Sequence, residues 1–281
     1  MGRDVSMMNR FKPIITYFTA ILIALFILTP LIWTFLCSVK PDSEILRHSS
    51  RILPSKFVFD NYINLFKKTQ FLSYFLNSVF VGVVTTPLTL MIATPAAYSL
   101  TRFRYRGRNL YAGFILFSYM VPLLLLGIPM FMIMGYFKLL NTRASLILSY
   151  VAFSLPFSMW MLRSFFLSIP LALEEAAMVD GTSRLGALLR IVLPLSRPGL
   201  IACGIFTFVL VWNEYTLALL FIRSETLKTL PIGIAAFIGT TAYEWGYILS
   251  SIIMMTFPIL IAFIFVQRAL IRGFLIGATK G

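Results

Sequence analysis

Long runs without a charged residue dominate the chain and indicate helices that cross a membrane. One run lies between Lys12 and Lys40, and a longer one lies between Lys68 and Arg102. A helix needs about 20 largely apolar residues to cross roughly 30 Å of hydrocarbon, and both runs are long enough. The pattern predicts an all-α fold with six transmembrane helices near residues 14–37, 74–101, 110–136, 144–166, 200–222 and 247–269.

The composition supports a membrane protein rather than a soluble one. Hydrophobic residues make up 59% of the 281 residues and charged residues only 12%, whereas soluble domains carry roughly 25% charged residues. The first apolar run is longer than the 7–15 residues typical of a signal peptide, so we expect it to be retained as a span. No repeat or low-complexity linker interrupts the chain, which favours a single membrane domain over residues 1–281.

The positive charge predicts the orientation of the chain in the membrane. Lys and Arg number 24 against 10 Asp and Glu, a net charge of +14, which in a soluble chain would suggest nucleic acid as a partner. With six spans, 14 of these cations lie on the side of the two termini and 10 on the other. Loops 102–108 and 163–197 carry four each, whereas the short loops opposite carry two each. Because cytoplasmic loops collect Lys and Arg, both termini are predicted to be cytoplasmic, with no role in nucleic-acid binding.

Few residues offer catalytic or metal-binding chemistry. Cys37 and Cys203 lie in apolar runs, and His48 is the one histidine, so neither a zinc site nor a disulfide is expected. The chain has no glycine-rich phosphate-binding motif of the kind that cradles nucleotides. We therefore expect no cofactor, no metal and no enzymatic activity, with any energy supplied by a partner or a gradient.

The predicted cytoplasmic loop 167–199 is unusually long for a helix connection. Pro170 suits the first turn of a helix, and Gly181 suits its end. A hydroxyl then caps a second helix. The predicted elements are a helix after Pro170, a cap at Thr182 or Ser183, a second helix to Val192, and chain breaks at Pro194 and Pro198.

Helical spacing gives both short helices an amphipathic pattern. Leu171, Glu174, Glu175 and Met178 share one face of the first helix, and Leu185, Leu188, Leu189 and Val192 form an apolar stripe on the second. One explanation is that the helices lie on the lipid interface or pack beneath the spans. The other is that they dock into a groove on a soluble partner, with acidic and small residues at the contact.

The loop resembles the EAA signature of bacterial ABC importer permeases, through Glu175-Ala176-Ala177, Asp180-Gly181, Ile191 and Pro194. Matches along most of the chain resemble the maltose-type subfamily of sugar permeases. They are Asn77-Ser78, Ala97-Tyr98, Arg102-Phe103, Gly107-Arg108, Leu155-Pro156, Trp212-Asn213, Leu230-Pro231, Trp245-Gly246, Gln267-Arg268 and the terminal Gly277–Gly281. Leu188 departs from the Phe usual in the family, and Thr182 from the common Ala.

The resemblance implies a type I (MetI-like) permease fold in the bacterial cytoplasmic membrane. It implies a second homologous permease subunit, two cytoplasmic ATPase subunits that hydrolyse the ATP, an extracytoplasmic binding protein and a sugar substrate. Residues 170–192 would be the coupling region that docks on the ATPase. The residues assigned to coupling are Glu174, Glu175, Ala176, Ala177, Asp180, Gly181, Ile191 and Pro194.

Polar residues within the spans are candidates for the translocation path, since such groups are costly in a membrane. The main candidates are Asn77, Ser78, Asn213, Glu214 and Tyr215, with Thr85, Thr86, Ser154 and Ser158 as further ones. The cluster around Glu214 could equally be a hydrogen-bonded helix contact or a water-exposed helix end.

Two other classes of membrane protein compete with the permease. A secondary transporter or channel usually shows inverted repeats and midplane charges, and a membrane enzyme needs a catalytic constellation. Neither feature is evident in the sequence.

Overall fold

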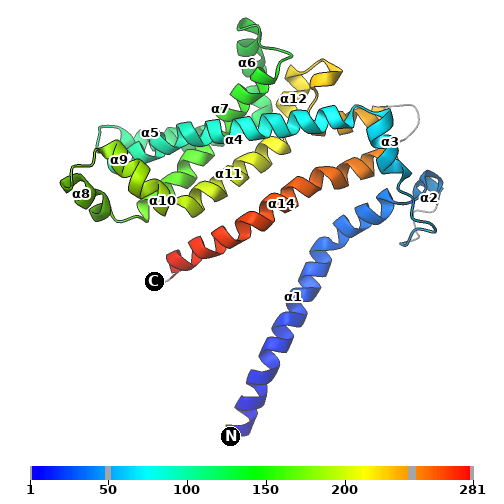
Figure 1. Cartoon of the computed structure of the whole chain (residues 1–281), viewed down its shortest axis with the longest axis horizontal. Helices are drawn as coiled ribbons and strands as arrows, with labels where there is room; N and C mark the ends of the chain where they lie inside the picture. Colours follow the sequence, from blue (N-terminus) through cyan, green and yellow to red (C-terminus); the bar gives the residue numbers. More distant parts are fainter. Residues whose placement is uncertain (1, 48–51, 240–244, 279–281) are drawn as a thin grey trace. The chain divides into compact units, whose positions relative to one another are not determined.

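The computed structural model describes residues 2–47, 52–239 and 245–278, and all regular structure in these ranges is helical (Figure 1). This confirms the prediction of an all-α fold. The α-helices are α1 (Gly2–Ser38), α2 (Asp42–Arg47), α3 (Asp60–Lys68), α4 (Phe71–Arg102), α5 (Arg108–Tyr119), α6 (Leu123–Tyr136), α7 (Arg143–Leu167), α8 (Leu171–Val179), α9 (Arg184–Ala187), α10 (Leu193–Leu195), α11 (Arg197–Trp212), α12 (Thr216–Phe221), α13 (Leu230–Ala236) and α14 (Trp245–Ala278). A π-helical stretch, η1 (Leu188–Val192), and two 3₁₀ turns, η2 (Glu225–Leu227) and η3 (Phe237–Gly239), complete them.

Four helices are long and apolar enough to cross a membrane as single segments. They cover Ile15–Ser38, Phe71–Arg102, Arg143–Leu167 and Trp245–Ile264, and they coincide with the predicted spans 14–37, 74–101, 144–166 and 247–269. Pro87 and Pro95 lie inside α4 without ending it. Membrane helices tolerate such prolines because neighbouring groups satisfy the freed carbonyls.

The other two predicted spans are not single helices, which corrects the sequence interpretation. The span 110–136 is broken between α5 and α6, whose axes differ by 97°. Pro122 lacks an N–H and disfavours helical geometry at the residue before it, so the helix ends at this point. The span 200–222 is interrupted after Trp212, and α12 begins only at Thr216.

Contacts divide the chain into two compact units, and the first contains residues up to Thr69 together with 237–254. Within it, the end of α1 is tied to α3. The side-chain amide of Asn61 donates to the carbonyls of Ser38 (3.1 Å) and Lys40 (3.2 Å), and the hydroxyls of Ser38 and Tyr62 lie 2.7 Å apart. Between Ile15 and Pro30 the side chains of α1 are exposed, as expected of a helix that faces lipid or another subunit.

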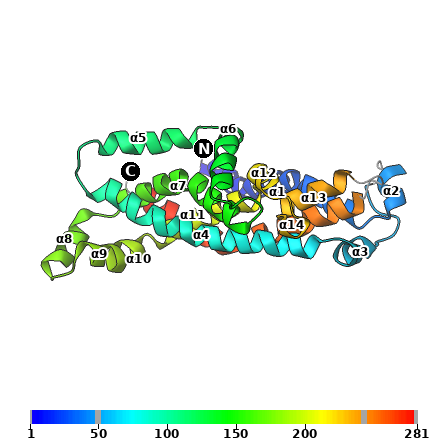
Figure 2. The ribbon, with the colours of Figure 1, turned by 90° about the horizontal axis from the view of Figure 1, so that it is seen from above.

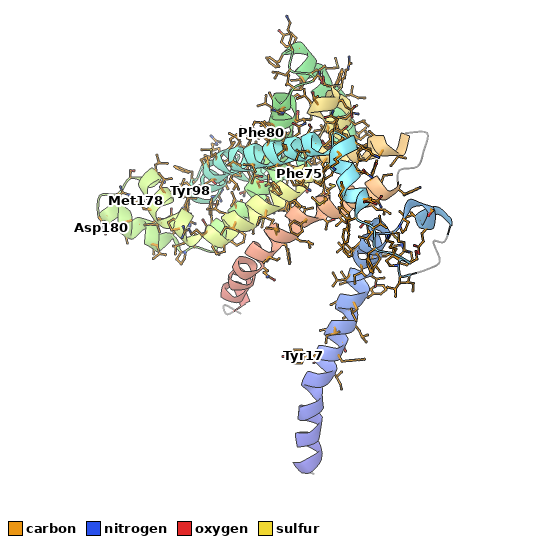
Figure 3. The ribbon with its side chains drawn as sticks, turned by 45° about the vertical axis from the view of Figure 1, so that its right-hand side comes forward. Tyr17, Phe75, Phe80, Tyr98, Met178 and Asp180 are labelled. Atoms are coloured by element: carbon orange, nitrogen blue, oxygen red, sulfur yellow. The ribbon has the colours of Figure 1, made fainter. Side chains whose placement is uncertain are left out.

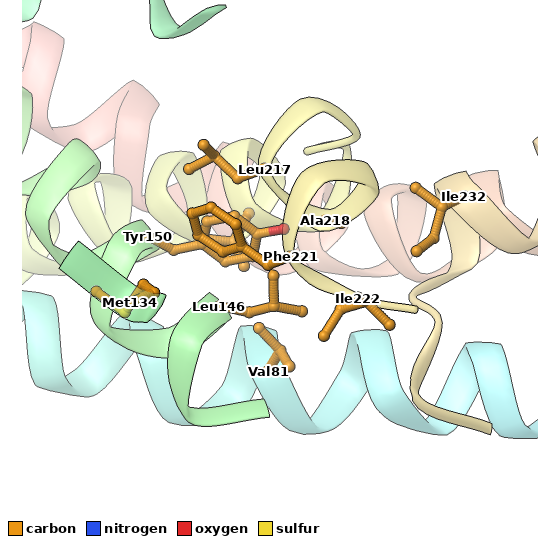
Figure 4. Packing of buried hydrophobic residues seen from close by; sticks show 10 residues of the cluster. Val81, Met134, Leu146, Tyr150, Leu217, Ala218, Phe221, Ile222 and Ile232 are labelled. Atoms are coloured by element: carbon orange, nitrogen blue, oxygen red, sulfur yellow. The ribbon is translucent and has the colours of Figure 1, made fainter. Parts of the chain in front are cut away.

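The second unit contains residues 70–236 and the chain from Met255 onward, and α4, α7 and α11 form its core. Buried side chains gather in two clusters. The Phe221 cluster is formed by Val81, Met134, Leu146, Tyr150, Val211, Leu217, Ala218, Phe221, Ile222 and Ile232 (Figure 4). The Phe166 cluster is formed by Ala93, Ala97, Tyr98, Leu162, Phe166, Ile169, Leu188, Val192 and Cys203. Figures 1 and 2 show α8 and α9 at one end of α4, away from α12 and α13.

Candidate functional site

The loop between α7 and α11 folds largely as its sequence predicts. The first helix, α8, begins directly after Pro170, and Gly181 adopts a left-handed conformation with φ +88° just beyond its end. Of the two predicted caps the structure uses Ser183, whose Oγ accepts the N–H of Gly186 at 3.1 Å. A left-handed residue is unfavourable with any Cβ, so glycine suits this turn.

The second helix of the loop runs further than predicted and corrects the placement of the breaks. It continues through η1 and past Pro194 to Leu195, and the chain bends by 79° at Ser196. In η1 the N–H of Leu193 donates to the carbonyl of Leu188, five residues back. Pro198 lies in the first turn of α11, where a missing N–H costs nothing.

A buried ion pair anchors α8 to the spans. Arg102 Nε donates to Glu174 Oε1 at 2.6 Å, and the Tyr98 hydroxyl donates to Glu174 Oε2 at 2.7 Å. Arg102 Nη2 also donates to the carbonyls of Phe166 (3.0 Å) and Ile169 (2.9 Å) at the end of α7. Glu174 is only 1% exposed. Because a buried charge is tolerated only when it is paired and hydrogen-bonded, this contact requires α4, α7 and α8 to keep their arrangement.

The helical face predicted to hold Leu171, Glu174, Glu175 and Met178 is not uniformly exposed. Glu174 is buried, and Ala177 and Met178, one helical turn further on, are half-buried, whereas Glu175 and Ala176 are exposed. Figure 3 shows Met178 and Asp180 at the tip of the loop.

The apolar stripe of the second short helix is likewise only partly buried. Leu188 and Val192 are buried in the Phe166 cluster, whereas Leu185 and Leu189 remain exposed. Among the other residues assigned to coupling, Asp180 and Pro194 are exposed and Ile191 is half-buried. Eight of the exposed residues of the loop are named the docking surface, for the contact with a partner that is proposed below: Leu171, Leu173, Glu175, Ala176, Val179, Asp180, Leu185 and Leu189.

Asn77 and Ser78 hold a loop in place. The amide of Asn77 donates to the carbonyls of Thr226 (2.8 Å) and Lys228 (2.9 Å) and accepts Arg143 Nε at 3.0 Å. The Oγ of Ser78 accepts the N–H of Leu230 at 2.8 Å. Both side chains are buried. Their polar groups are thus engaged in fixing residues 226–230 to α4, and a direct role in translocation stays a prediction.

Glu214 caps the start of α12. Its carboxylate accepts the N–H groups of Leu217 (2.8 Å) and Ala218 (3.2 Å) and the Tyr150 hydroxyl (2.7 Å). The side chain is buried. This geometry matches the alternative of a hydrogen-bonded helix contact. Asn213 and Tyr215 remain exposed, and their contact with a transported substrate stays a prediction.

Further polar candidates form a seam between spans. The hydroxyls of Thr89 and Ser154 lie 3.0 Å apart, and those of Ser158 and Thr207 lie 3.2 Å apart. These contacts join α4 to α7 and α7 to α11. The hydroxyls of Thr85 and Thr86 are buried without a hydrogen-bond partner among the described residues.

Sequence reasoning did not assign Tyr98 and Arg102 to the site. Both belong to the motifs that carry the resemblance, but nothing in their spacing connects them to Glu174, more than 70 residues away. The sequence did contain one signal. Arg102 lies at the end of a predicted span, and the next predicted cytoplasmic loop, 163–197, carries three acidic residues. Within the described ranges, no three His, Cys, Asp or Glu side chains lie close enough to hold a metal ion.

The long apolar helices, and the loop that is anchored between two of them, define a multi-span membrane protein. Residues 89–276 match the family of binding-protein-dependent transport system inner membrane components. The chain belongs to this family, and it is a multi-pass protein of the inner membrane. This confirms the prediction of an ABC importer permease over that of a secondary transporter or channel.

Curated relatives cover most of the chain. It is 37% identical over 254 residues to the sulfoquinovosyl glycerol transport system permease protein SmoH of Agrobacterium fabrum, covering 90% of this chain and 89% of that one. It is 35% identical over 256 residues to the trehalose transport system permease protein SugB of Mycobacterium tuberculosis, covering 90% and 93%. The trehalose/maltose transport system permease protein MalG of Thermococcus litoralis is 34% identical, with coverage of 96% and 98%.

A solved structure shares the fold. A chain in the crystal structure of a bacterial ABC transporter that imports the acidic polysaccharide alginate superposes with a TM-score of 0.77 and 24% identity. The match covers 95% of this chain and 98% of that one.

Proposed function

We propose that the chain is one permease subunit of an ATP-driven importer for a sugar or oligosaccharide. The curated relatives whose names specify trehalose, maltose or a sulfoquinovosyl glycerol support a carbohydrate substrate. The complete importer would contain a second homologous permease, two cytoplasmic ATPase subunits and an extracytoplasmic binding protein. ATP hydrolysis would take place in the ATPase subunits, since this sequence has no nucleotide-binding motif.

The buried ion pair between Glu174 and Arg102 is the observation that carries the proposed mechanism. A loop that transmits force must be attached firmly to the helices it moves, and this pair attaches α8 to α4 and α7. Closure of the ATPase dimer would shift the docking surface, and the ion pair would carry that shift into the spans. Access to the translocation path would then alternate between the two sides of the membrane.

Glu175 is the residue best placed to bind the ATPase. It is exposed one position after the anchored Glu174, and Ala176 beside it lets a partner backbone approach closely. Charge complementarity across an interface gives specificity, so Glu175 would pair with a basic group of the ATPase. The exposed leucines and Val179 of the docking surface supply the apolar contacts.

Charge reversal at Glu175 tests this assignment. We expect Glu175→Lys to reduce co-purification with the ATPase subunits, and ATP-dependent sugar uptake by the reconstituted importer, by at least about tenfold, because it places a cation against a basic groove. Asp60→Lys is the matched control, since it makes the same charge change at an exposed position in α3. Normal association and uptake in Glu175→Lys would show that the coupling assignment is wrong.

A further inference from the structure

The turn that joins α4 to α5 forms a basic depression that the coupling mechanism does not use. It has a volume of about 500 Å³ and is lined by Arg104, Tyr105, Arg106, Gly107, Arg108, Asn109 and Leu110. Gly107 has φ +85°, and the N–H of Arg108 bonds to the carbonyl of Tyr105 at 3.3 Å, which closes the turn. Three guanidinium groups thus lie within five residues around one open cavity.

The positive charge of this depression is not neutralised within the described part of the chain. The salt bridges there are Arg102–Glu174 and Lys228–Glu225, so neither engages the arginines of the turn. The polar contact of Arg108 is with the carbonyl of Phe103, at 3.3 Å from Nη1. Arg184, which stacks 5.2 Å from the centre of the Phe103 ring, brings another cation next to the turn. The depression is therefore suited to an anion.

An exposed apolar surface begins directly beside the depression. Leu110, Phe114 and Phe117 recur at helical spacing on α5, and each is more than half exposed. Tyr111 is similarly exposed, and its ring lies 6.5 Å from that of Tyr105. Tyrosines concentrate at membrane–water interfaces, so this pair is placed as expected where lipid headgroups meet acyl chains.

We propose that this depression binds the headgroup of an anionic phospholipid. The guanidinium groups of Arg104, Arg106 and Arg108 would hold the phosphate, with the bidentate geometry that arginine favours. The acyl chains would lie along the apolar face of α5. The charge distribution predicts that loop 102–108 is cytoplasmic, and basic pockets between transmembrane helices on that side are suited to anionic headgroups.

The proposal is tested on the purified importer in nanodiscs of phosphatidylcholine doped with phosphatidylglycerol. Native mass spectrometry measures how much phosphatidylglycerol remains bound, and a phosphatidylglycerol with a photoreactive acyl chain identifies the residues it touches. We expect the triple variant Arg104→Gln, Arg106→Gln, Arg108→Gln to lower the affinity for phosphatidylglycerol about a hundredfold. Each basic residue near an anionic headgroup raises the affinity about fivefold, and three such residues are removed. We expect crosslinks on α5 in the unaltered protein.

The control removes the same number of charges from exposed positions elsewhere, by Lys67→Gln, Lys68→Gln and Arg223→Gln. It should retain phosphatidylglycerol fully. The variant with three lysines in place of the arginines should retain an intermediate amount, and it covers the case in which the glutamine variant does not fold. Equal retention in all variants would overturn the proposal. So would displacement by inorganic phosphate alone, or crosslinks that join α5 to a protein subunit instead of lipid.

Discussion

Neighbouring residues of one helix have opposite roles in the loop between α7 and α11. Glu174 is buried against Arg102 and Tyr98, whereas Glu175 is exposed. Both are acidic, and both lie near the start of α8, so the local pattern predicts that this turn carries negative charge but cannot rank the two. The distinction depends on Arg102, which is adjacent only in the folded chain. Spacing alone therefore locates the acidic turn but does not distinguish the buried carboxylate from the exposed one.

Replacing Glu174 separates anchoring from docking. We expect Glu174→Gln to lower the free energy of unfolding by about 3 kcal/mol, because it leaves Arg102 buried without its counter-charge. Sugar uptake should fall with it, since α8 loses its attachment to α4. Chemical unfolding of the detergent-solubilised protein, followed by circular dichroism, measures the change.

Glu175→Gln is the matched control, and its stability should stay within about 0.5 kcal/mol of the unaltered protein because the side chain is exposed. Equal stability of both variants would contradict the anchoring role of Glu174.

The sequence predicts where the transmembrane helices lie, but it predicts only some of the points at which they are interrupted. The positions of the spans follow from apolar length, which any single sequence displays. The break after Trp212 depends on Glu214, whose carboxylate replaces the missing backbone partners at the start of α12 and is itself held by Tyr150. That contact spans two helices and has no local signature. The bend at Pro122 had a local cause, but proline alone does not break a span, as Pro87 in α4 shows.

The turn between α8 and α9 gives a prediction at the scale of the element. Gly181 has a left-handed backbone with open space around it, so Gly181→Ala should cost about 1 kcal/mol through backbone conformation alone. Gly113→Ala is the control, because Gly113 lies inside α5 with no atom near the added methyl, and there alanine should stabilise the helix. Thermal unfolding of both variants compares the two effects. A Gly181→Ala variant as stable as Gly113→Ala would rule out the left-handed turn.

The whole molecule leaves much apolar surface uncovered. The side chains of α1 are exposed between Ile15 and Pro30, and α5 and α6 expose many of theirs. The bilayer and the proposed second permease subunit are the surfaces that would cover them. The hydrophobic pattern predicted that these segments enter the membrane. It could not show which of them face protein, because lipid and a neighbouring helix select the same residues.

The chain alone should be inactive in transport. We expect liposomes that contain only this subunit to accumulate no trehalose or maltose, because the sequence supplies no means of using ATP. Liposomes with the second permease, the ATPase subunits and the binding protein should take up the sugar that the binding protein selects. Radiolabelled sugar on filters measures both, and uptake by the isolated subunit would favour a secondary transporter.

Helix α4 is attached to other segments near both of its ends. Tyr98 and Arg102 bind α8 near one end, and Asn77 and Ser78 bind residues 226–230 near the other. At 1.5 Å per residue, Asn77 and Arg102 lie about 37 Å apart along the helix, so a tilt of about 5° about the α8 end would displace the opposite end of α4 by about 3 Å. Pro87 and Pro95 lie between the two attachments and remove backbone hydrogen bonds there. The stiffness of α4 around Pro87 and Pro95 would therefore determine how much of a displacement of α8 is transmitted to the opposite face of the membrane.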